Sequence, residues 1–478
     1  MASRLFDMSL RVDAPGPGGL AVANNLRFMA RSPRYLLGRL ERFSGRSVVP
    51  VTGGNGSIVV LRGPAASRLL FTDNETFQRP PGILTVPPGR PWSGMFDAVI
   101  TANGAEHTRR RRLVMPAVHR TAVERYTEVF ARTFAESRFA GGQTAPFDAK
   151  AEFLRISKAN LLRCLLGLEP TPALTAQADV IVRLGGEALS PGVLALRRDI
   201  PFTPYSRWLR RVAWAYERLA TLIERRRTEP PAPDALSILC HTRDESGDHL
   251  TTGEIVGELH GFFSAGFETS AMTMTVALLA LVGSPDPAGA ARADVDTATG
   301  LDAAVREAQR VMPVVPITLP RHTTRAVTVA ETEVPAGAWT FVSPLLEHRD
   351  ASVYPQPHRF SPARWTSAPG GPYTFMPFGM GPRRCLGAEF ADAQVRTTLR
   401  LIAERGLPSL VTTEIGYDTV NGVVAGPPNP VVVDPARPAT TLTRITGGVT
   451  ASGPDSCCHS IISATASLNS PSPGDPAP

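Results

Sequence analysis

One cysteine of this chain lies among residues that suit the binding of a metal or cofactor better than packing. Cys385 is part of the segment Pro377–Gly387, PFGMGPRRCLG, where it follows two adjacent arginines and has glycines on both sides. A buried structural thiol would need apolar neighbours, and a zinc site would need further ligands at close spacing, which the sequence does not supply. A nucleophile of the protease type would need a histidine base, and no local signature points to one.

The same neighbours meet the requirements of a thiolate ligand to a haem iron. Glycines let the backbone pass close beneath a flat cofactor and turn N–H groups towards the sulfur. A helix that begins at the cysteine would place its positive end there and lower the thiol pKa. An arginine two residues earlier, Arg383, could meet a haem propionate. These residues therefore favour a haem-thiolate site at Cys385.

The stretch FGMGPRRCLG resembles the haem-binding signature of the cytochrome P-450 family, F-G-x-G-x-R-x-C-x-G, and matches it at every specified position. A match of six fixed residues within ten is specific. The resemblance implies that Cys385 is the axial thiolate ligand of a haem b iron. It also implies that Phe378 shields the sulfur and that Arg383 binds a propionate. Gly379 and Gly387 would shape the loop beneath the porphyrin.

The family also has a Glu-x-x-Arg pair on an upstream helix, and this spacing places both side chains on one helix face. Four such pairs occur in the chain, so the spacing alone carries little information. Only Glu307–Arg310 lies on a predicted helix that leads through predicted strands and a proline-rich segment to the cysteine. The family's third partner, an arginine in that segment, matches Arg364 in FSPARW. The resemblance implies a buried structural network that supports haem incorporation.

The oxygen-binding motif of the family, A-G-x-[D/E]-T, resembles AGFET, Ala265–Thr269. From the residues alone, a packed patch of small residues in a buried helix is an alternative interpretation. An acid beside a hydroxyl in an apolar helix is nevertheless hard to explain by packing. The resemblance implies that Gly266 leaves room for dioxygen and that Glu268 and Thr269 deliver protons to it.

A basic run early in the chain, HTRRRRLVMPA, matches a further family feature, a histidine and an arginine that hold the haem propionates. His107 and Arg111 occupy the matching positions, four residues apart. Arg321, in LPRHTTR, stands where the family often has another propionate-binding arginine. On the residues alone, the remaining arginines of the run form a solvated basic face or an anion-binding patch. In the family, basic residues of this helix also help to dock the electron donor.

The implied reaction is that of a haem-thiolate monooxygenase, which inserts one oxygen atom from O2 into a lipophilic small molecule by hydroxylation or epoxidation. The chain has no flavin module and no C-x4-C-x2-C cluster, so electrons are expected from separate proteins, a ferredoxin and a reductase. Family analogy and composition suggest bacterial secondary metabolism, such as terpenoid, fatty-acid or polyketide tailoring. The alternatives are a peroxide-using haem-thiolate enzyme and a non-catalytic haem-thiolate binding or sensor protein, and both would be expected to lack the acid–hydroxyl pair.

The residues that would face the substrate are less well indicated. Gly82–Ile100 resembles the loop that closes over the haem in this family, and Trp92, Met95 and Phe96 would give it an apolar lining. Ordinary core packing explains these three residues equally well. The region Leu165–Trp208 is expected to form the lid.

The elements that must position these motifs are mostly helical. The sequence predicts a mainly α protein with small β-sheets, and the resemblance implies the cytochrome P-450 fold in a single large triangular domain. A capping box, Thr251 with Glu254, begins the helix that carries AGFET. A strand pair is predicted around the turn TGGNG, and a second hairpin is predicted to turn at Pro335–Gly337. The helix after the cysteine is predicted to end at Gly406.

Composition limits the partners and the compartment. Of 478 residues 43% are hydrophobic, and the net charge of +7 comes almost entirely from arginine, so nucleic acid is not an expected partner. Five scattered cysteines predict a reducing, cytoplasmic location. The apolar stretch Gly261–Gly283 is long enough to span a bilayer, but Glu268 would be costly there. A buried helix and no transmembrane segment are therefore expected.

The expected organisation has three parts. Residues 1–20 form an N-terminal arm, 21–436 the haem domain, and 437–478 a disordered tail rich in Ser, Thr, Gly and Pro. Cys457, Cys458 and His459 lie in this tail, and without a second cluster they make a poor zinc site.

Overall fold

The structure is a computed structural model that describes most of the chain between residues 45 and 438. The described residues are 45–50, 58–80, 86–142, 144–188, 190–283, 300–367, 370–412, 415, 417–421 and 423–438. Their α-helices are α3 (Pro64–Thr72), α4 (Gly104–Val118), α5 (Arg120–Ala135), α6 (Ala149–Leu166), α7 (Pro172–Ala188), α8 (Pro191–Ala195), α9 (Pro204–Thr228), α10 (Ala235–His241), α11 (Thr252–Val282), α13 (Leu301–Val311), α14 (Pro344–Glu347) and α15 (Ala388–Arg405). Their 3-10 helices are η2 (Pro91–Phe96), η3 (Pro362–Ser367) and η4 (Gly381–Arg383). Their strands are β1 (Val48–Pro50), β2 (Ile58–Leu61), β3 (Phe77–Gln78), β4 (Phe147–Asp148), β5 (Arg321–Thr323), β6 (Val327–Val329), β7 (Thr332–Val334), β8 (Trp339–Val342), β9 (Pro408–Leu410), β10 (Asp418–Asn421), β11 (Val424–Gly426) and β12 (Val432–Pro438). The predicted arm 1–20 and nearly all of the predicted tail lie outside the described residues.

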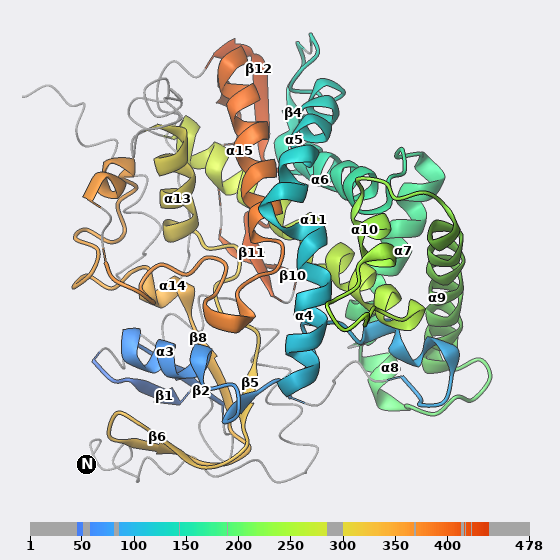
Figure 1. Cartoon of the computed structure of the whole chain (residues 1–478). Helices are drawn as coiled ribbons and strands as arrows, with labels where there is room; N and C mark the ends of the chain where they lie inside the picture. Colours follow the sequence, from blue (N-terminus) through green and yellow to red (C-terminus); the bar gives the residue numbers. More distant parts are fainter. Residues whose placement is uncertain are drawn as a thin grey trace, which may run out of the picture.

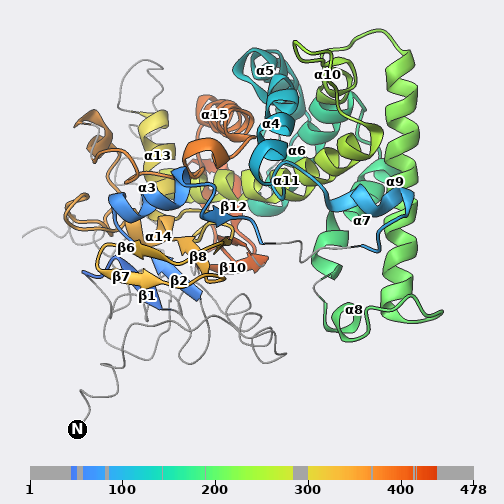
Figure 2. The same cartoon turned by 60° about the horizontal axis from the view of Figure 1, so that its bottom comes forward.

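Helices and small sheets occupy different parts of the molecule. Figure 1 shows the strands β1, β2, β6 and β8 at one edge and the helices α7, α9 and α10 at another. In the turned view of Figure 2, α11 passes through the centre, between the helices α4–α10 and the sheets. The mainly α fold with small sheets that the sequence predicts is confirmed. The AGFET motif thus lies on the central helix.

α11 begins with the capping box that the sequence predicts. The Thr251 hydroxyl accepts from the Glu254 N–H at 3.3 Å, and the Glu254 carboxylate accepts from the Thr251 N–H at 2.7 Å. Among the described helices, α11 is the one that is long and apolar enough to cross a membrane, with a mean hydropathy of 1.5 over 18 residues. Of that stretch 61% is buried inside the protein, which is the burial expected of a core helix.

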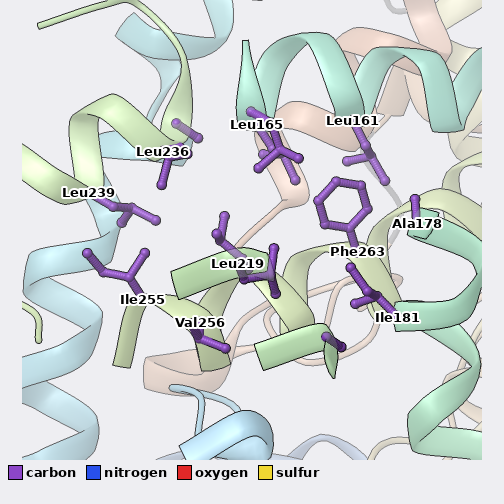
Figure 3. Close-up of a cluster of buried hydrophobic side chains, with 14 of the residues drawn as sticks. Leu161, Leu165, Ala178, Ile181, Leu219, Leu236, Leu239, Ile255, Val256 and Phe263 are labelled. Atoms are coloured by element: carbon purple, nitrogen blue, oxygen red, sulfur yellow. The ribbon is translucent and has the colours of Figure 1, made fainter. Parts of the chain in front are cut away.

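α6, α7 and α11 meet in the main apolar cluster of the protein. Leu161 and Leu165 of α6 lie above Phe263 of α11, while Ala178 and Ile181 of α7 lie beside and below it (Figure 3). All five side chains are at most 8% exposed. Burying a leucine, isoleucine or phenylalanine side chain stabilises a fold by about 1.5–3 kcal/mol. These contacts fix the position of α11 between α6 and α7.

The segment after η2 packs closely on the first half of α11. A Cβ added to Gly257 would lie 2.0 Å from the Asp97 carbonyl oxygen, so glycine is needed for this approach. One residue further on, the buried carboxylate of Glu258 accepts from the Val99 N–H at 2.8 Å. Burial raises the pKa of Glu258 to about 7, and the nearby guanidinium of Arg110 acts in the opposite direction. Two contacts therefore hold this segment against the helix.

The largest sheet has five strands in the order β1-β2-β8-β5-β3. The predicted first hairpin is confirmed, because β1 pairs antiparallel with β2, with Val48 opposite Leu61. Its turn lies outside the described residues. The other sheets have the orders β4-β12-β9, β6-β7 and β10-β11.

The second predicted hairpin turns at a different place. The sequence predicts the turn at Pro335–Gly337, but β6 pairs with β7, and the chain reverses at Ala330 and Glu331. Ala330 has a φ of 52°, and a left-handed turn without glycine or proline escapes the usual sequence signal. After Gly337 the chain enters β8 of the large sheet instead.

The observed ends of two helices agree with the ends that the sequence predicts. α13 ends at Val311, just before Pro313. α15 ends at Arg405 and has Gly406, with a φ of 95°, as its C-cap. Proline and glycine therefore mark these two ends correctly.

Candidate active site

Backbone hydrogen bonds and two left-handed glycines shape the cysteine loop, PFGMGPRRCLG. The Cys385 N–H donates to the Phe378 carbonyl at 2.8 Å, which closes the loop. Gly379 and Gly381 have φ values of 67° and 66°, a conformation that other residues disfavour. A Cβ on Gly381 would also lie 2.7 Å from the carbonyl oxygen of Phe71 in α3. The fold of the loop itself therefore requires both glycines.

Gly387 differs from these glycines. Its φ is −86°, and a Cβ added to it would meet no protein atom within 4 Å. Neither the backbone nor the packing of the described residues explains why this position lacks a side chain. The sequence predicts a helix that begins at Cys385, but α15 begins at Ala388 with Gly387 as its N-cap. The helix still acts on the cysteine, because the Gly387 N–H at its start acts to lower the pKa of the Cys385 thiol.

Cys385 is the exposed one of the three cysteines that the structure describes, since Cys164 and Cys240 are buried. The protein around the Cys385 thiol raises its pKa, while the neighbouring N–H and the guanidinium groups of Arg384 and Arg111 act to lower it. The thiol is thus accessible although it is surrounded by protein. An N–H donor and positive groups beside a thiol favour its thiolate form, which is the form that binds a metal.

Four arginines and a histidine from separate segments come together beside the cysteine loop, and we call them the cation cluster. They are His107 and Arg111 on α4, Arg321 on β5, Arg383 in η4, and Arg79 directly after β3. Burial and these four positive charges lower the pKa of His107 to about 4. Burial lowers the pKa of Arg383 to about 10 and that of Arg321 to about 9, and neighbouring guanidinium groups add to both effects. Within the part of the chain that the structure describes, no salt bridge joins these arginines to a carboxylate.

Arg79 and its hydrogen-bond partner Asn103 are residues of the site that sequence reasoning missed. The Asn103 side-chain carbonyl accepts from the Arg79 backbone N–H and from Arg383 Nη2, each at 2.8 Å. The Asn103 amide donates to the Arg79 carbonyl at 3.0 Å. Neither residue belongs to a recognisable motif. The one available signal was an asparagine directly before a helix, a common N-cap residue, and α4 does begin there.

Two donors of the cation cluster lack a protein acceptor among the described residues. The Nε atoms of Arg79 and Arg383 are buried and make no hydrogen bond to the described residues. Clustered guanidinium groups repel one another unless an anion lies among them. The donors and charges present therefore fit an anionic group such as the two carboxylates of a haem, which is the role that the sequence predicts for this set.

The structure brings Glu307, Arg310 and Arg364 together, and we call this group the Glu307 network. The side chains of Glu307 and Arg310 are 0% exposed, and that of Arg364 is 9% exposed. Arg310 holds the Glu307 carboxylate through Nη2 and Nε, at 2.8 and 2.9 Å. Arg364 Nε lies 3.2 Å from the same carboxylate. The predicted contacts are therefore present, and the acid is held from two sides.

Two further residues of the Glu307 network have no signal in the sequence. Trp365 donates its indole N–H to Glu307 at 3.0 Å. The His348 carbonyl accepts from Arg310 Nη1 at 2.7 Å, and the His348 ring Nε2 accepts from the Met376 N–H at 2.9 Å. Burial, reinforced by Arg310, lowers the pKa of His348 to about 3, so the ring is neutral and can accept. His348 therefore connects the network to the residue before the cysteine loop.

The AGFET motif lies where the burial of α11 is interrupted. Ala265 is exposed and Gly266, Glu268 and Thr269 are half-buried, although most of the helix is buried before and after them. The Thr269 hydroxyl donates to the Ala265 carbonyl at 2.6 Å, a contact that tends to bend helices. An accessible face therefore opens on α11 at the motif.

Gly266 has a packing role that the resemblance did not assign to it. A Cβ on Gly266 would lie 3.3 Å from Cδ2 of Leu161 in α6. Ala265 is the small residue that presents exposed surface. The small size of Gly266 thus serves the contact with α6, and Ala265 lies on the accessible side.

The two lysines of the chain both lie on α6, and both interact with the AGFET segment. Lys150 donates to three carbonyls of the β11–β12 connection at 3.0–3.1 Å. Burial lowers the pKa of Lys150, and the charges of Asp148 and, to a smaller extent, Glu268 act against this. Lys158 Nζ lies 5.4 Å from the ring centroid of Phe267 and 2.5 Å from Oδ1 of Asp179 in α7. Lys158 therefore joins α6, α7 and α11 at one point.

The structure decides between the two interpretations of the η2 residues. Met95 and Phe96 are 0% and 6% exposed and belong to the main apolar cluster, and Trp92 is half-buried against it. Phe96 is stacked on Trp208, with ring centroids 5.8 Å apart. These side chains are core residues in this structure. Residues 82–85 of the predicted loop lie outside the described residues.

Comparisons with known proteins agree on one family. The family model described as cytochrome P-450 matches residues 42–405. Cytochrome P-450 135B1 of Mycobacterium tuberculosis is 31% identical to this chain over 418 residues, which cover 84% of this chain and 86% of the mycobacterial protein. The chain belongs to the cytochrome P-450 family.

Solved structures show the same fold. A cyanobacterial cytochrome P-450 with bound retinoic acid has a TM-score of 0.64 and 22% identity, over 79% of this chain and 88% of that one. CYP109E1 from Bacillus megaterium in complex with testosterone has a TM-score of 0.65 and 19% identity, over 83% and 98% of the two chains. This cytochrome P-450 is a haem-thiolate monooxygenase, an oxidoreductase that binds a haem iron through a cysteine thiolate.

Proposed function

We propose that this cytochrome P-450 inserts one oxygen atom from O2 into a lipophilic small molecule, with Cys385 as the axial thiolate ligand. The observation that carries the proposal is an accessible thiol with an N–H donor and guanidinium groups around it. Gly387 supports it, because a flat cofactor over the loop would leave no room for a side chain there. The bound haem supplies the activation of dioxygen, which thiolate ligation promotes.

The cation cluster would hold the haem by its carboxylates. Arg383 and Arg111 bring positive charge to the side of the cysteine loop, and His107 would contribute a hydrogen bond. Phe378 would shield the sulfur, and Gly379 would shape the loop beneath the porphyrin. The Glu307 network would keep the loop in place through His348 and the preceding backbone.

Thr269 and Glu268 would hold and move protons at the accessible face of α11. The Thr269 hydroxyl donates to the Ala265 carbonyl, so it lies next to Ala265, the residue of the motif that is exposed. Glu268 precedes Thr269 directly in the chain, and its charge acts on Lys150 of α6. Gly266 would act by letting α6 approach the helix at this point.

The substrate is proposed to be lipophilic, and bacterial secondary metabolism, such as terpenoid, fatty-acid or polyketide tailoring, is its proposed setting. The ligands named for the two similar structures, retinoic acid and testosterone, are lipophilic and support the class. A separate ferredoxin and reductase would supply electrons in the cytoplasm. Residues 21–436 would form the haem domain, flanked by the arm 1–20 and the tail 437–478.

The absorption spectrum of the reduced, carbon-monoxide-bound protein tests the iron ligand. The wild type is expected to show the red-shifted Soret band of a thiolate-ligated haem, and Cys385→Ala is expected to lose it. Cys240→Ala, which removes a buried thiol, is the matched control and should keep the band. A Cys385→Ala protein with an unchanged band would refute the assignment, and so would a wild type without the red shift.

A second test addresses the proton-delivery residues. Thr269→Ala should keep the thiolate band but form product at least about tenfold more slowly and release electrons as hydrogen peroxide, because a positioned proton donor is lost. Thr273→Ala is the control, since the Thr273 hydroxyl makes the same type of bond one turn later, to the Thr269 carbonyl at 2.8 Å. Equal peroxide yields from the two variants would contradict the role of Thr269. A screen for ligand-induced spin-state changes would identify the substrate for this assay.

A further inference from the structure

A buried carboxylate that belongs to neither the Glu307 network nor the cation cluster lies at the start of α3. Glu347, the last residue of α14, is 5% exposed, and both oxygens of its carboxylate accept from the Gly63 N–H at 3.1 Å. Gly63 is the N-cap of α3, and α3 has no side-chain cap of its own. A carboxylate in this place satisfies a free N–H and interacts favourably with the positive end of the helix. Glu347 therefore caps α3, although 284 residues separate it from Gly63 in the sequence.

The charge of Glu347 is not balanced by an ion pair. Among the described residues, no salt bridge reaches its carboxylate, and the Gly63 N–H is its hydrogen-bond donor. Burial raises the pKa of Glu347 to about 7 and the charge of Asp350 adds to this effect, whereas the Gly63 N–H and the charge of Arg62 act in the opposite direction. The adjacent His348 is neutral, since its pKa is about 3. The charged form of a buried carboxylate is costly without a counter-ion, so stability alone does not account for an acid in this place.

The other end of α3 contacts both parts of the proposed haem site. The Leu70 carbonyl accepts from Arg321 Nη1 of the cation cluster at 2.6 Å, and the Arg321 guanidinium carbon lies 5.8 Å from the ring centroid of Phe71. Gly381 of the cysteine loop approaches the Phe71 carbonyl so closely that a Cβ on this glycine would lie 2.7 Å from the oxygen. α3 has only 9 residues, so a displacement of its first turn is passed on to its last turn.

α14 and the residue after it hold the cysteine loop from two sides. The His348 ring accepts from the Met376 N–H just before the loop. Glu347, its direct neighbour, holds α3, and Leu70 and Phe71 of α3 lie in one apolar cluster with Met376. Figures 1 and 2 both show α3 beside α14. Two adjacent residues therefore reach the loop by separate routes.

We propose that Glu347 is a positioning residue of the haem site, which acts through α3 on Arg321 and on the cysteine loop. Its carboxyl group fixes the start of α3, and the end of α3 sets the place of the Arg321 guanidinium and of the Gly381 backbone. The retention of haem then depends on whether Glu347 carries its proton. This inference rests on the haem site proposed at Cys385 and adds a residue that no motif of the sequence indicates.

Retention of haem should weaken as the pH rises. The folded pKa of Glu347 is about 7 against an ordinary value of 4.5, so the folded protein binds this proton more tightly than a released, hydrated carboxyl group does. The stabilisation is complete below about pH 4.5 and is lost as the pH rises through about 7. Ionised Glu347 then gains free energy by leaving the protein interior, and the start of α3 is released with it.

Transfer of haem from the haem-loaded protein to apomyoglobin tests the proposal. Glu347→Gln keeps an oxygen that can accept from the Gly63 N–H, but it cannot ionise. The ratio of the wild-type rate to the Glu347→Gln rate should rise about tenfold between about pH 6 and about pH 8. Other titrating groups act on both proteins alike and cancel in this ratio. Glu347→Ala lacks the acceptor and should lose haem faster than Glu347→Gln at both pH values.

Glu152→Gln is the matched control. Glu152 of α6 is also a buried carboxylate, 6% exposed, and it accepts from a backbone N–H, that of Arg138, at 2.9 Å. This variant should lose haem at the wild-type rate at both pH values. The proposal is overturned if the ratio for Glu347→Gln is the same at both pH values, or if Glu152→Gln reproduces its change. It is also overturned if the Glu347 variants alter the free energy of unfolding but not the rate of haem loss.

A failure of the proposed haem site gives a different pattern of results. Hydrogen exchange of the Ser67 amide, which donates to the Gly63 carbonyl in the first turn of α3, reports the anchoring without haem. Its protection factor in the wild type should fall relative to that in Glu347→Gln between the same two pH values. If it does so while the wild type lacks the Soret band of a thiolate-ligated haem, the haem site is refuted and the anchoring of α3 by Glu347 stands.

Discussion

The Glu307 network and the cation cluster are both buried groups of arginines, but only the network contains an acid. In the network, Arg310 and Arg364 close on one carboxylate and donate their remaining N–H groups to backbone carbonyls. In the cation cluster, the arginines lower one another's pKa, and the Nε atoms of Arg79 and Arg383 lack an acceptor among the described residues. The network is complete as protein, whereas the cation cluster is complete only with an anionic ligand.

This difference explains why two similar-looking sets of arginines serve different purposes. A buried charge without its partner is costly, so a fold retains one only where a partner arrives. The network fixes the cysteine loop in the folded chain, through His348 and Met376. We propose that the cation cluster instead provides binding energy for the haem. Substitutions in the Glu307 network should lower the stability of the fold, and substitutions in the cation cluster should weaken the retention of the ligand.

The largest effect is expected for breaking the network. Arg310→Gln leaves the Glu307 carboxylate without its bidentate partner and should lower the free energy of unfolding by about 3–5 kcal/mol. The control is Arg120→Gln, which breaks the Arg120–Glu124 pair within α5, where both side chains are exposed, at 79% and 63%. That change should cost less than about 1 kcal/mol. Urea unfolding followed by circular dichroism measures both, and equal losses would remove the distinction between the buried and the exposed pair.

A smaller and different effect is expected for the cation cluster. Arg383→Gln should leave the unfolding free energy nearly unchanged, because it relieves repulsion, but should speed haem loss about tenfold through one missing charged hydrogen bond. Transfer of haem to apomyoglobin measures the rate. Arg384→Gln is the neighbouring control, because Arg384 makes only an exposed pair with Glu389 at 3.3 Å in the described chain. If Arg384→Gln releases haem as fast as Arg383→Gln, the cluster does not bind the haem as we propose.

The smallest effect concerns pH and His107. The folded pKa of His107 is about 4 against an ordinary value of 6.5, so the unfolded chain takes up the proton first and stability falls as pH drops through this range. His107→Gln should therefore lose less stability than the wild type between about pH 6.5 and pH 4. Haem carboxylates would raise the pKa of His107. The stability difference between His107→Gln and the wild type should therefore be smaller in haem-loaded protein. If the stability difference between His107→Gln and the wild type is the same with and without haem, His107 does not lie beside the haem carboxylates.

The motif residues of the site could be predicted from the sequence, because each motif is local. Cys385, Glu307 with Arg310, and AGFET were recognisable from spacings of a few residues. Arg79 and His348 could not be found in this way, because each acts on residues far along the chain and becomes part of a site only after folding. The packing role of Gly266 could not be predicted for the same reason, because its small size serves a contact with Leu161, about a hundred residues away in sequence.

Turns and helix ends were predictable only where a special residue marks them. Gly406 ends α15 as expected. Ala330 makes a left-handed turn without glycine, so the hairpin was placed one strand too late. The start of α15 at Ala388 was also misplaced, since the loop before it forms η4 before the α-helix begins.

The scarcity of lysine gives the protein a built-in chemical reporter. Of the two lysine amines, that of Lys150 is occupied by three carbonyls, while that of Lys158 is shared between Asp179 and the face of Phe267. An amine-directed acylating reagent can react with Lys158 only when its amine leaves the carboxylate of α7. The rate of acylation at this residue, read by mass spectrometry, would therefore report how often the Lys158–Asp179 ion pair between α6 and α7 opens next to the AGFET motif.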